Sequence, residues 1–139
     1  MSYKHIQTVP NNVMIAASLA GLAVSLAPPL MLARLLMMGT LGTTAAIFRV
    51  LTVEVDEEYI HWRFGNGFPS WSLPLAEISA VETIRTTPLM GWGIHYVGHG
   101  WLYNIYGLNA VDLTHKDGRH TIIGTDDAAN LAAVIGERI

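Results

Sequence analysis

Hydrophobic residues run almost without interruption through the first part of the chain and alternate with polar residues through the rest. The uninterrupted stretch extends from Val13 to Phe48 and holds one charged residue, Arg34. A single helix of that length would measure about 54 Å, well beyond the hydrocarbon core of a bilayer, which is about 30 Å thick. Because Pro29 lacks an N–H and disfavours helical geometry at Pro28, the sequence predicts two helices joined at these prolines, forming a transmembrane hairpin.

Two other interpretations of the apolar stretch stay open. Lys4, a short apolar run and Ser25-Leu26-Ala27 also match a secretory signal peptide, although a proline at the first mature position disfavours cleavage. The stretch also fits a buried helical pair in a soluble protein, but such a pair needs a larger core partner than the remaining residues supply. A hairpin would leave both chain ends on one side of the membrane. Lys4, Arg49 and Arg63 on that side, against Arg34 at the turn, favour the cytoplasm.

From Leu51 onward the period of the pattern changes to two. Leu51, Val53 and Val55 alternate with Thr52 and Glu54, as expected for a strand with one buried face. The same signal predicts seven or eight short strands, among residues 51–55, 59–64, 70–75, 80–85, 93–97, 101–106, 110–115 and 119–124. Lys116-Asp117-Gly118 is typical of a hairpin turn between the last two strands, and a helix is expected from Thr125 or Asp126 to about Arg138.

Charge divides the chain in the same place as hydropathy. Residues 1–49 contain three basic and no acidic residues, whereas residues 50–139 contain eleven acidic and five basic residues, a net charge of about −6. Nucleic-acid binding needs clustered Lys and Arg to displace counterions from phosphates, and no such cluster is present. The absence of cysteine excludes disulfides, thiolate zinc sites and cysteine nucleophiles. The balance therefore predicts no nucleic-acid partner.

Three segments carry a resemblance to a known family: "RVLTVEVDEEYIHWRFG", "WSLPLAEISAVE" and "GWGIHYVGHGWLYNIYGLNAVDLTHKDGRHTIIGTDD". Preceded by an apolar hairpin, they resemble small bacterial membrane proteins with a pleckstrin-homology-like (PH-like) domain. The resemblance implies an α+β fold in which a membrane-anchoring hairpin over residues 1–50 precedes a PH-like split β-barrel over residues 51–139. That barrel would have about seven strands and a C-terminal capping helix, and the family implies an adaptor role without catalytic activity.

The stretch from Gly91 to Gly107 concentrates aromatic, histidine and glycine residues. Its glycines disfavour a helix, so His95 and His99 are not expected to form the paired ligands of a helical zinc motif. Exposed aromatic side chains without charge indicate a protein contact or a membrane interface. The candidate interaction surface therefore comprises Trp92, His95, Tyr96, His99, Trp101, Tyr103, Asn104 and Tyr106.

Motifs for catalysis are absent from the sequence. Ser70 and Ser72 lack a nucleophile-elbow context, and Asp126-Asp127 fits a helix start better than an acid–base pair. No catalytic residue, cofactor or metal ligand is assigned. The sequence thus predicts a membrane-anchored interaction module that contacts the bilayer through residues 13–48. The domain would face the cytoplasm from a bacterial inner membrane and bind an unknown protein or its own copies. The alternatives are a lipid-headgroup-binding module and a metal-dependent enzyme using the His-rich surface.

Overall fold

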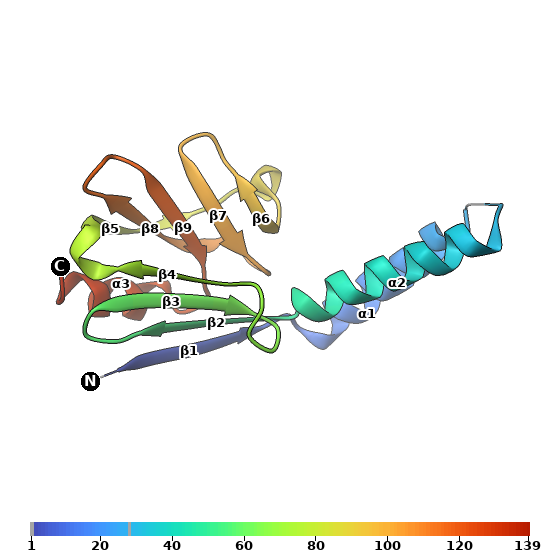
Figure 1. The fold of residues 1–139 in the computed structure, drawn as a ribbon, viewed down its shortest axis with the longest axis horizontal. Coiled ribbons are helices and arrows are strands. Elements are labelled where there is room, and N and C mark those ends of the chain that lie inside the picture. The colour runs from blue at the N-terminus through green and yellow to red at the C-terminus, as the bar shows by residue number, and fades with distance from the viewer. Residues whose placement is uncertain (1, 28) are drawn as a thin grey trace.

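The computed structural model describes residues 2–27 and 29–139, and within them the chain forms two β-sheets, a helical hairpin and a C-terminal helix (Figure 1). The first sheet, in the order β1-β2-β3-β4, comprises β1 (Tyr3–Thr8), β2 (Val50–Val55), β3 (Tyr59–Phe64) and β4 (Ser70–Pro74). The second, in the order β5-β8-β9-β7-β6, comprises β5 (Ile78–Arg85), β6 (Gly93–Tyr96), β7 (Gly100–Asn104), β8 (Asn109–His115) and β9 (His120–Gly124). The helical elements are α1 (Asn11–Ser25), α2 (Met31–Ile47), α3 (Ala128–Gly136) and two short 3-10 turns, η1 (Leu75–Glu77) and η2 (Pro88–Met90).

The alternating pattern of β3 shows why the first sheet forms. Ile60, Trp62 and Phe64 are buried, while His61 and Arg63 between them remain partly exposed. Successive side chains of a strand point to opposite faces, so this spacing places the apolar set on the core side. The positions of the predicted strands at residues 51–55 and 59–64 are confirmed.

Strand β1 is one that the hydrophobic pattern does not reveal. It pairs antiparallel with β2, ending in the pair Thr8↔Val50. Its inward positions hold Tyr3, His5 and Gln7, whose polar groups hide the alternation on which the sequence argument depends. The helical hairpin is therefore inserted between two strands that lie side by side.

The second sheet contains one parallel pair. β7 runs parallel to β9, with Gly100 opposite His120, whereas its other pairs are antiparallel. The predicted hairpin between β8 and β9 is confirmed, and Gly118 in its turn has φ of +88°, a conformation that glycine adopts without a steric penalty.

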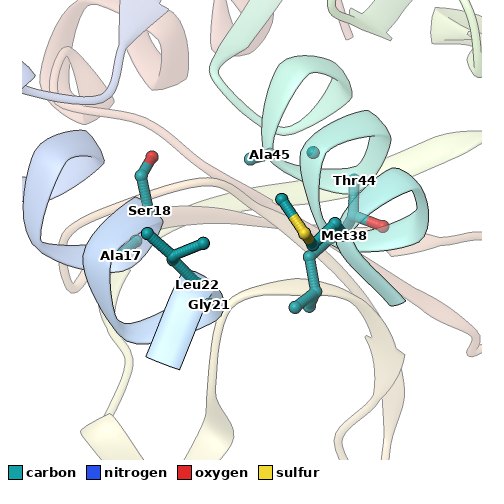
Figure 2. A pocket seen from close by; sticks show the side chains of 9 residues that line it. Ala17, Ser18, Gly21, Leu22, Met38, Thr44 and Ala45 are labelled. Atoms are coloured by element: carbon teal, nitrogen blue, oxygen red, sulfur yellow. The ribbon is translucent and has the colours of Figure 1, made fainter. Parts of the chain in front are cut away.

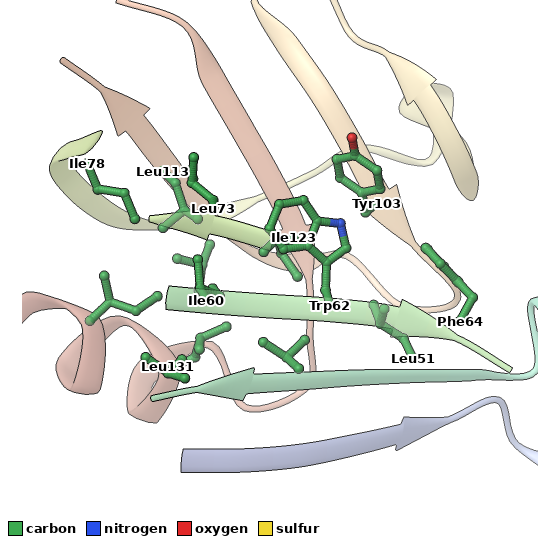
Figure 3. Packing of buried hydrophobic residues seen from close by; sticks show 14 of the residues in the cluster. Leu51, Ile60, Trp62, Phe64, Leu73, Ile78, Tyr103, Leu113, Ile123 and Leu131 are labelled. Carbon is green, nitrogen blue, oxygen red and sulfur yellow. The ribbon is translucent and has the colours of Figure 1, made fainter. Parts of the chain in front are cut away.

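The main core lies between the two sheets and α3 (Figure 3). Phe64 and Leu51 from the first sheet and Leu113 and Ile123 from the second are almost fully buried. Helix α3 packs on β5 and β8 and contributes Leu131 and Ile135, both with 0% exposure. Complete burial of a side chain of this size stabilises a fold by about 2 kcal/mol. The predicted C-terminal helix is present but shorter than expected, from Ala128 to Gly136.

The predicted transmembrane hairpin is wrong. Among the described residues, no helix is long and apolar enough to cross a membrane. Helices α1 and α2 contain 15 and 17 residues, about 22 and 25 Å, against a hydrocarbon core of about 30 Å. The sequence argument counted Leu30 and Phe48 as helical, whereas they cap the two ends of α2. The predicted break lies at Pro28-Pro29, of which Pro28 is outside the described residues.

The predicted fold class is corrected accordingly. The described chain is an α+β structure with nine strands in two sheets and three helices, in place of a transmembrane hairpin followed by a barrel of about seven strands. Strand β1 is one of the strands beyond the predicted number. The two helices of the hairpin project away from one end of the β-structure (Figure 1).

Candidate functional site

The surface of the hairpin is apolar along both helices. The exposed fractions of Leu30, Met31 and Leu32, beside the tip, are 70%, 75% and 69%. The large hydrophobic side chains exposed on the hairpin are Ile15, Leu19, Leu22, Val24, Leu26, Leu30, Met31, Leu32, Leu35, Leu36, Met38 and Leu41. A soluble surface rarely presents a continuous apolar area of this extent, so this surface is a candidate binding site.

The two helices meet along a line of small residues. Figure 2 shows the shallow pocket between them, where Ala17 and Gly21 of α1 face Ala45 and Met38 of α2. A Cβ added at Gly21 would lie 3.5 Å from Leu41 Cδ1, an ordinary van der Waals distance, so the two helices are close together at this point. Small residues at a helix contact allow the backbones to approach closely, so the hairpin is held together by packing.

Four of the five hydroxyl groups of the hairpin helices are bonded to carbonyls of their own helices. Ser18 donates to the Met14 carbonyl at 2.7 Å, and Thr44 donates to the Thr40 carbonyl at 2.8 Å. Ser25 and Thr40 make similar bonds to carbonyls in the preceding turn. Such bonds satisfy a hydroxyl without water, so these side chains add little polarity to the hairpin surface.

Three large hydrophobic side chains are exposed in loops at the end of the β-structure from which the hairpin projects. We call Phe68, Leu89 and Trp92 the hairpin-end patch; their exposed fractions are 80%, 98% and 58%. Phe68 lies in the β3–β4 loop, which begins with Gly65 against the backbone of Ile47. Leu89 lies within η2, and Trp92 lies between η2 and β6. This segment is at the same end of the β-structure as the base of the hairpin (Figure 1).

A chain of contacts ties Trp92 to the base of the hairpin. The rings of Trp92 and Tyr106 lie 6.1 Å apart, and the Gln7 side chain donates to the Tyr106 carbonyl at 2.9 Å. Gln7 belongs to β1, whose end leads into α1. At that base, Arg49 donates to the Asn11 side chain at 3.2 Å. Trp92 is therefore fixed close to the point where the hairpin leaves the domain.

The structure disperses the eight residues of the predicted interaction surface. Trp92 and Tyr106 lie at the hairpin end, whereas Tyr96 and Trp101 flank the β6–β7 turn with their rings 6.0 Å apart in an edge-to-face arrangement. Tyr96 is 58% exposed and Trp101 is 50% exposed. His99 lies in the same turn and is also exposed. An interaction role for these residues stays a prediction.

Of the remaining three residues of that set, Tyr103 and Asn104 are buried and His95 is partly buried. The His95 ring contacts the Met90 carbonyl. Tyr103 is only 8% exposed, with its ring 5.2 Å from Trp62 and 4.8 Å from Trp71 (Figure 3). Burial raises the pKa of the Tyr103 hydroxyl, because it disfavours the ionised form. These positions act in packing, and the alternating sequence left open which side of β7 faces the core.

Asn104 organises the turn after β7. It is fully buried, donates to the Gly107 carbonyl at 3.1 Å and accepts from the Tyr106 N–H at 3.2 Å. A Cβ at Gly124 of the neighbouring strand β9 would lie 2.2 Å from the Asn104 side-chain oxygen. Only a glycine at position 124 leaves this space for Asn104. The glycine at the end of the predicted strand is therefore the feature of the sequence that indicates a close contact there.

The acidic pair before α3 links the first strand to the last helix. Tyr3 donates to Asp127 at 2.8 Å, and the His5 ring contacts Asp126 at 2.5 Å. Burial, followed by the bond to Asp127, raises the pKa of Tyr3. Asp127 directly precedes the helix, as the sequence predicted. The pair therefore connects β1 to α3 at a considerable sequence separation.

No protein-family model matches the chain, and no match is found among the curated proteins. The resemblance to PH-like proteins and the bacterial origin that it implies stay predictions.

Proposed function

We propose that this protein is a non-catalytic interaction module whose hairpin embeds in a lipid bilayer from one side, without crossing it, and holds the two-sheet domain at the surface. The observation that supports the proposal is the character of the hairpin surface. Its large apolar side chains point outward along both helices, while four of its five hydroxyls bond to carbonyls of their own helices. Water does not favour such a surface, whereas the interior of a bilayer requires polar groups to be satisfied internally.

The energy balance favours embedding. Ten of the outward-facing residues are Leu, Ile or Val, and at about 0.3–0.6 kcal/mol each they contribute about 3–6 kcal/mol toward insertion. Arg34 opposes insertion by about 2.5–3.5 kcal/mol at the middle of a bilayer and by less near its boundary. Because Arg34 lies in the first turn of α2, beside the tip, an embedded hairpin carries this charge at its deep end, and its cost offsets part of the apolar contribution.

The hairpin-end patch gives the domain a second contact with lipid. Phe68, Leu89 and Trp92 are exposed. The segments that carry them, the β3–β4 loop and the stretch from η2 to β6, lie at the end of the domain that an embedded hairpin would bring against the headgroups (Figure 1). Tryptophan favours that level of a bilayer because its ring is apolar while its N–H is polar. The patch would therefore restrict the tilt of the domain on the membrane.

The contact with a protein partner is proposed at Tyr96 and Trp101. This exposed aromatic pair lies at the β6–β7 turn, which points away from the hairpin (Figure 1). Aromatic side chains with one free face are enriched at protein interfaces. A partner bound there would not compete with lipid.

Vesicle flotation tests the lipid contact. The full chain, diluted from detergent into vesicles of phosphatidylcholine with or without phosphatidylglycerol, is expected to float with both. The domain carries eleven acidic and five basic residues over positions 50–139, so anionic lipid should not strengthen the association. Leu35→Asp combined with Leu36→Asp should keep most of the protein at the bottom of the gradient, whereas Trp101→Ala should float normally. Flotation that requires anionic lipid would favour headgroup recognition instead, and failure to float would contradict the proposal.

Cysteine labelling tests the depth of embedding, because the chain contains no native cysteine. Ala27→Cys at the tip should react with a membrane-impermeant maleimide in detergent but not in vesicles carrying the reagent on both sides. Asn66→Cys, in the β3–β4 loop, should react in both conditions. Labelling of residue 27 in vesicles would contradict embedding without crossing.

A further inference from the structure

His99, Asp112 and His120 come together on the second sheet although they are far apart in the sequence. One side-chain ligand atom from each lies within 4.8 Å of the others. His99 immediately precedes β7, Asp112 is in β8, and His120 is the first residue of β9. Val111 and Leu113, the neighbours of Asp112, belong to the main core, so alternation directs Asp112 to the opposite face of the sheet.

A glycine makes this convergence possible. Gly100 pairs with His120 in the parallel β7–β9 ladder, and a Cβ at Gly100 would lie 2.4 Å from the His120 carbonyl oxygen. No larger residue fits that gap without moving the backbone. The close approach places His99, the preceding residue, against His120, with ring centroids 5.1 Å apart and planes at 81°.

The distances match those between ligands of one small cation. His120 Nδ1 lies 3.1 Å from Asp112 Oδ2, and His99 Nε2 lies 3.6 Å from the same oxygen. In a tetrahedral zinc site with bonds of about 2.0–2.1 Å, neighbouring ligand atoms are about 3.3 Å apart. Two imidazoles and a carboxylate are also a donor set that zinc favours over magnesium or calcium.

Burial and charge support the same assignment. The Asp112 side chain is 13% exposed and that of His120 is 28% exposed, whereas His99 is 49% exposed. The carboxylate is thus held inside the cluster, and the exposed histidine leaves one side open to water. Glu82 of β5 lies directly opposite Asp112 in the antiparallel pair. Two carboxylates at such positions repel each other, and a divalent cation would remove that repulsion.

We propose that His99, Asp112 and His120 bind one divalent cation of the zinc class, with water at the remaining position. The site lies beside the exposed Tyr96–Trp101 pair, since His99 is in the turn between them. The bound metal would fix the β6–β7 turn to β8 and β9. This assignment does not depend on whether the hairpin contacts lipid.

Metal titration of the full chain in a mild non-ionic detergent tests the site. After removal of metals with a chelator and dialysis, Zn²⁺ competition with a chromophoric chelator should show one equivalent bound with micromolar or tighter affinity. Co²⁺ should give the intense visible bands of a four-coordinate site. His99→Ala, Asp112→Asn and His120→Ala should each weaken Zn²⁺ binding at least about tenfold, while circular dichroism checks that each variant folds.

His61→Ala is the matched control. His61 contacts Asp56 at 3.0 Å on the first sheet, so it is a histidine–aspartate pair without a second imidazole, and its loss should leave Zn²⁺ affinity unchanged. His99 lies in an exposed turn, so His99→Ala keeps the test valid if the other two variants fail to fold. Wild-type affinity in folded His99→Ala, or no binding below 100 μM by the native chain, would overturn the proposal.

Discussion

Glu54 lies between two cations on the outer face of the first sheet. Arg63 donates to both of its oxygens at 2.7 and 3.0 Å, and Lys4 contacts one of them at 2.8 Å. These bonds, the one from Arg63 foremost, lower the pKa of Glu54 from 4.5 to about 2. A two-point contact between a guanidinium and a carboxylate is among the stronger surface interactions. Arg63 thus links β3 to β2, and Lys4 links β1 to β2.

The lowered pKa predicts a pH-dependent contribution to stability. Because the folded protein holds the Glu54 proton more weakly than the unfolded chain, the contribution is complete above about pH 4.5 and is lost as the pH falls toward 2. Glu54→Gln should lower the free energy of unfolding by about 1 kcal/mol at pH 7, because the charges are partly exposed. The difference from the native chain should vanish near pH 2.

Urea unfolding in detergent, followed by tryptophan fluorescence between pH 2 and 7, measures this difference. Glu57→Gln makes the same chemical change in the β2–β3 turn, so its profile should follow that of the native chain. An equal loss of stability at pH 7 and at pH 2 would contradict the ion-pair explanation.

At the scale of elements, the contact between β7 and β9 depends on Gly124. Its missing side chain provides the space occupied by buried Asn104, whose Oδ1 and Cγ would lie 2.2 and 2.4 Å from an added Cβ. Gly124→Ala should therefore force the strands apart or displace Asn104 from its bonds to the turn. The expected loss is about 2–3 kcal/mol in the free energy of unfolding.

Gly39→Ala is a suitable control for this change. A Cβ at Gly39 meets nothing within 4 Å, and alanine favours a helix over glycine by about 1 kcal/mol, so this variant should be as stable as the native chain or slightly more so. Equal thermal unfolding of the Gly124 and Gly39 variants would show that the space at position 124 is not required.

The elements differ in how far the sequence could predict them. Strands β2, β3, β8 and β9 follow from alternation and turn residues, since both signals are local. Strand β1 was not predicted, because polar groups occupy its inward positions. The parallel pairing of β7 with β9 joins strands that are not consecutive, and no local pattern encodes it. The cluster of His99, Asp112 and His120 depends on that pairing, so its spacing in the sequence gives no indication of a metal site.

At the scale of the whole molecule, the hairpin and the β-structure have separate surfaces and share few contacts. Near the base of the hairpin, Val13, Met14, Ile47 and Phe48 pack against the core, and the rings of Phe48 and Phe64 are 5.0 Å apart. The sequence correctly predicted where the two helices lie along the chain, but it predicted helices that are longer than the observed ones. That error of a few residues is why the hairpin was predicted to cross a membrane.

Because the helical hairpin is inserted between the paired strands β1 and β2, we predict that the hairpin can be removed without loss of the β-structure. Thr8 pairs with Val50, and the Val9 N–H donates to the Arg49 carbonyl at 2.9 Å. The ends of β1 and β2 are therefore already close enough, just before α1 begins, to be joined by a tight β-turn. Replacing residues 10–48 with Asn-Gly should close them by a two-residue turn. Because the core contacts of Val13, Met14, Ile47 and Phe48 are lost, the shortened chain should be less stable by about 2–4 kcal/mol, but it should fold as a monomer in buffer without detergent.

Three measurements examine the shortened chain. Circular dichroism and amide NMR spectra should show the β-structure, light scattering should give the mass of a monomer, and vesicle flotation should leave it at the bottom of the gradient. If it also binds Zn²⁺ with the affinity of the full chain, the metal site and the lipid contact belong to independent parts of the molecule. An unfolded or aggregated product would mean that the hairpin is required for the β-structure to form. Flotation of a folded product would assign the lipid contact to the β-structure.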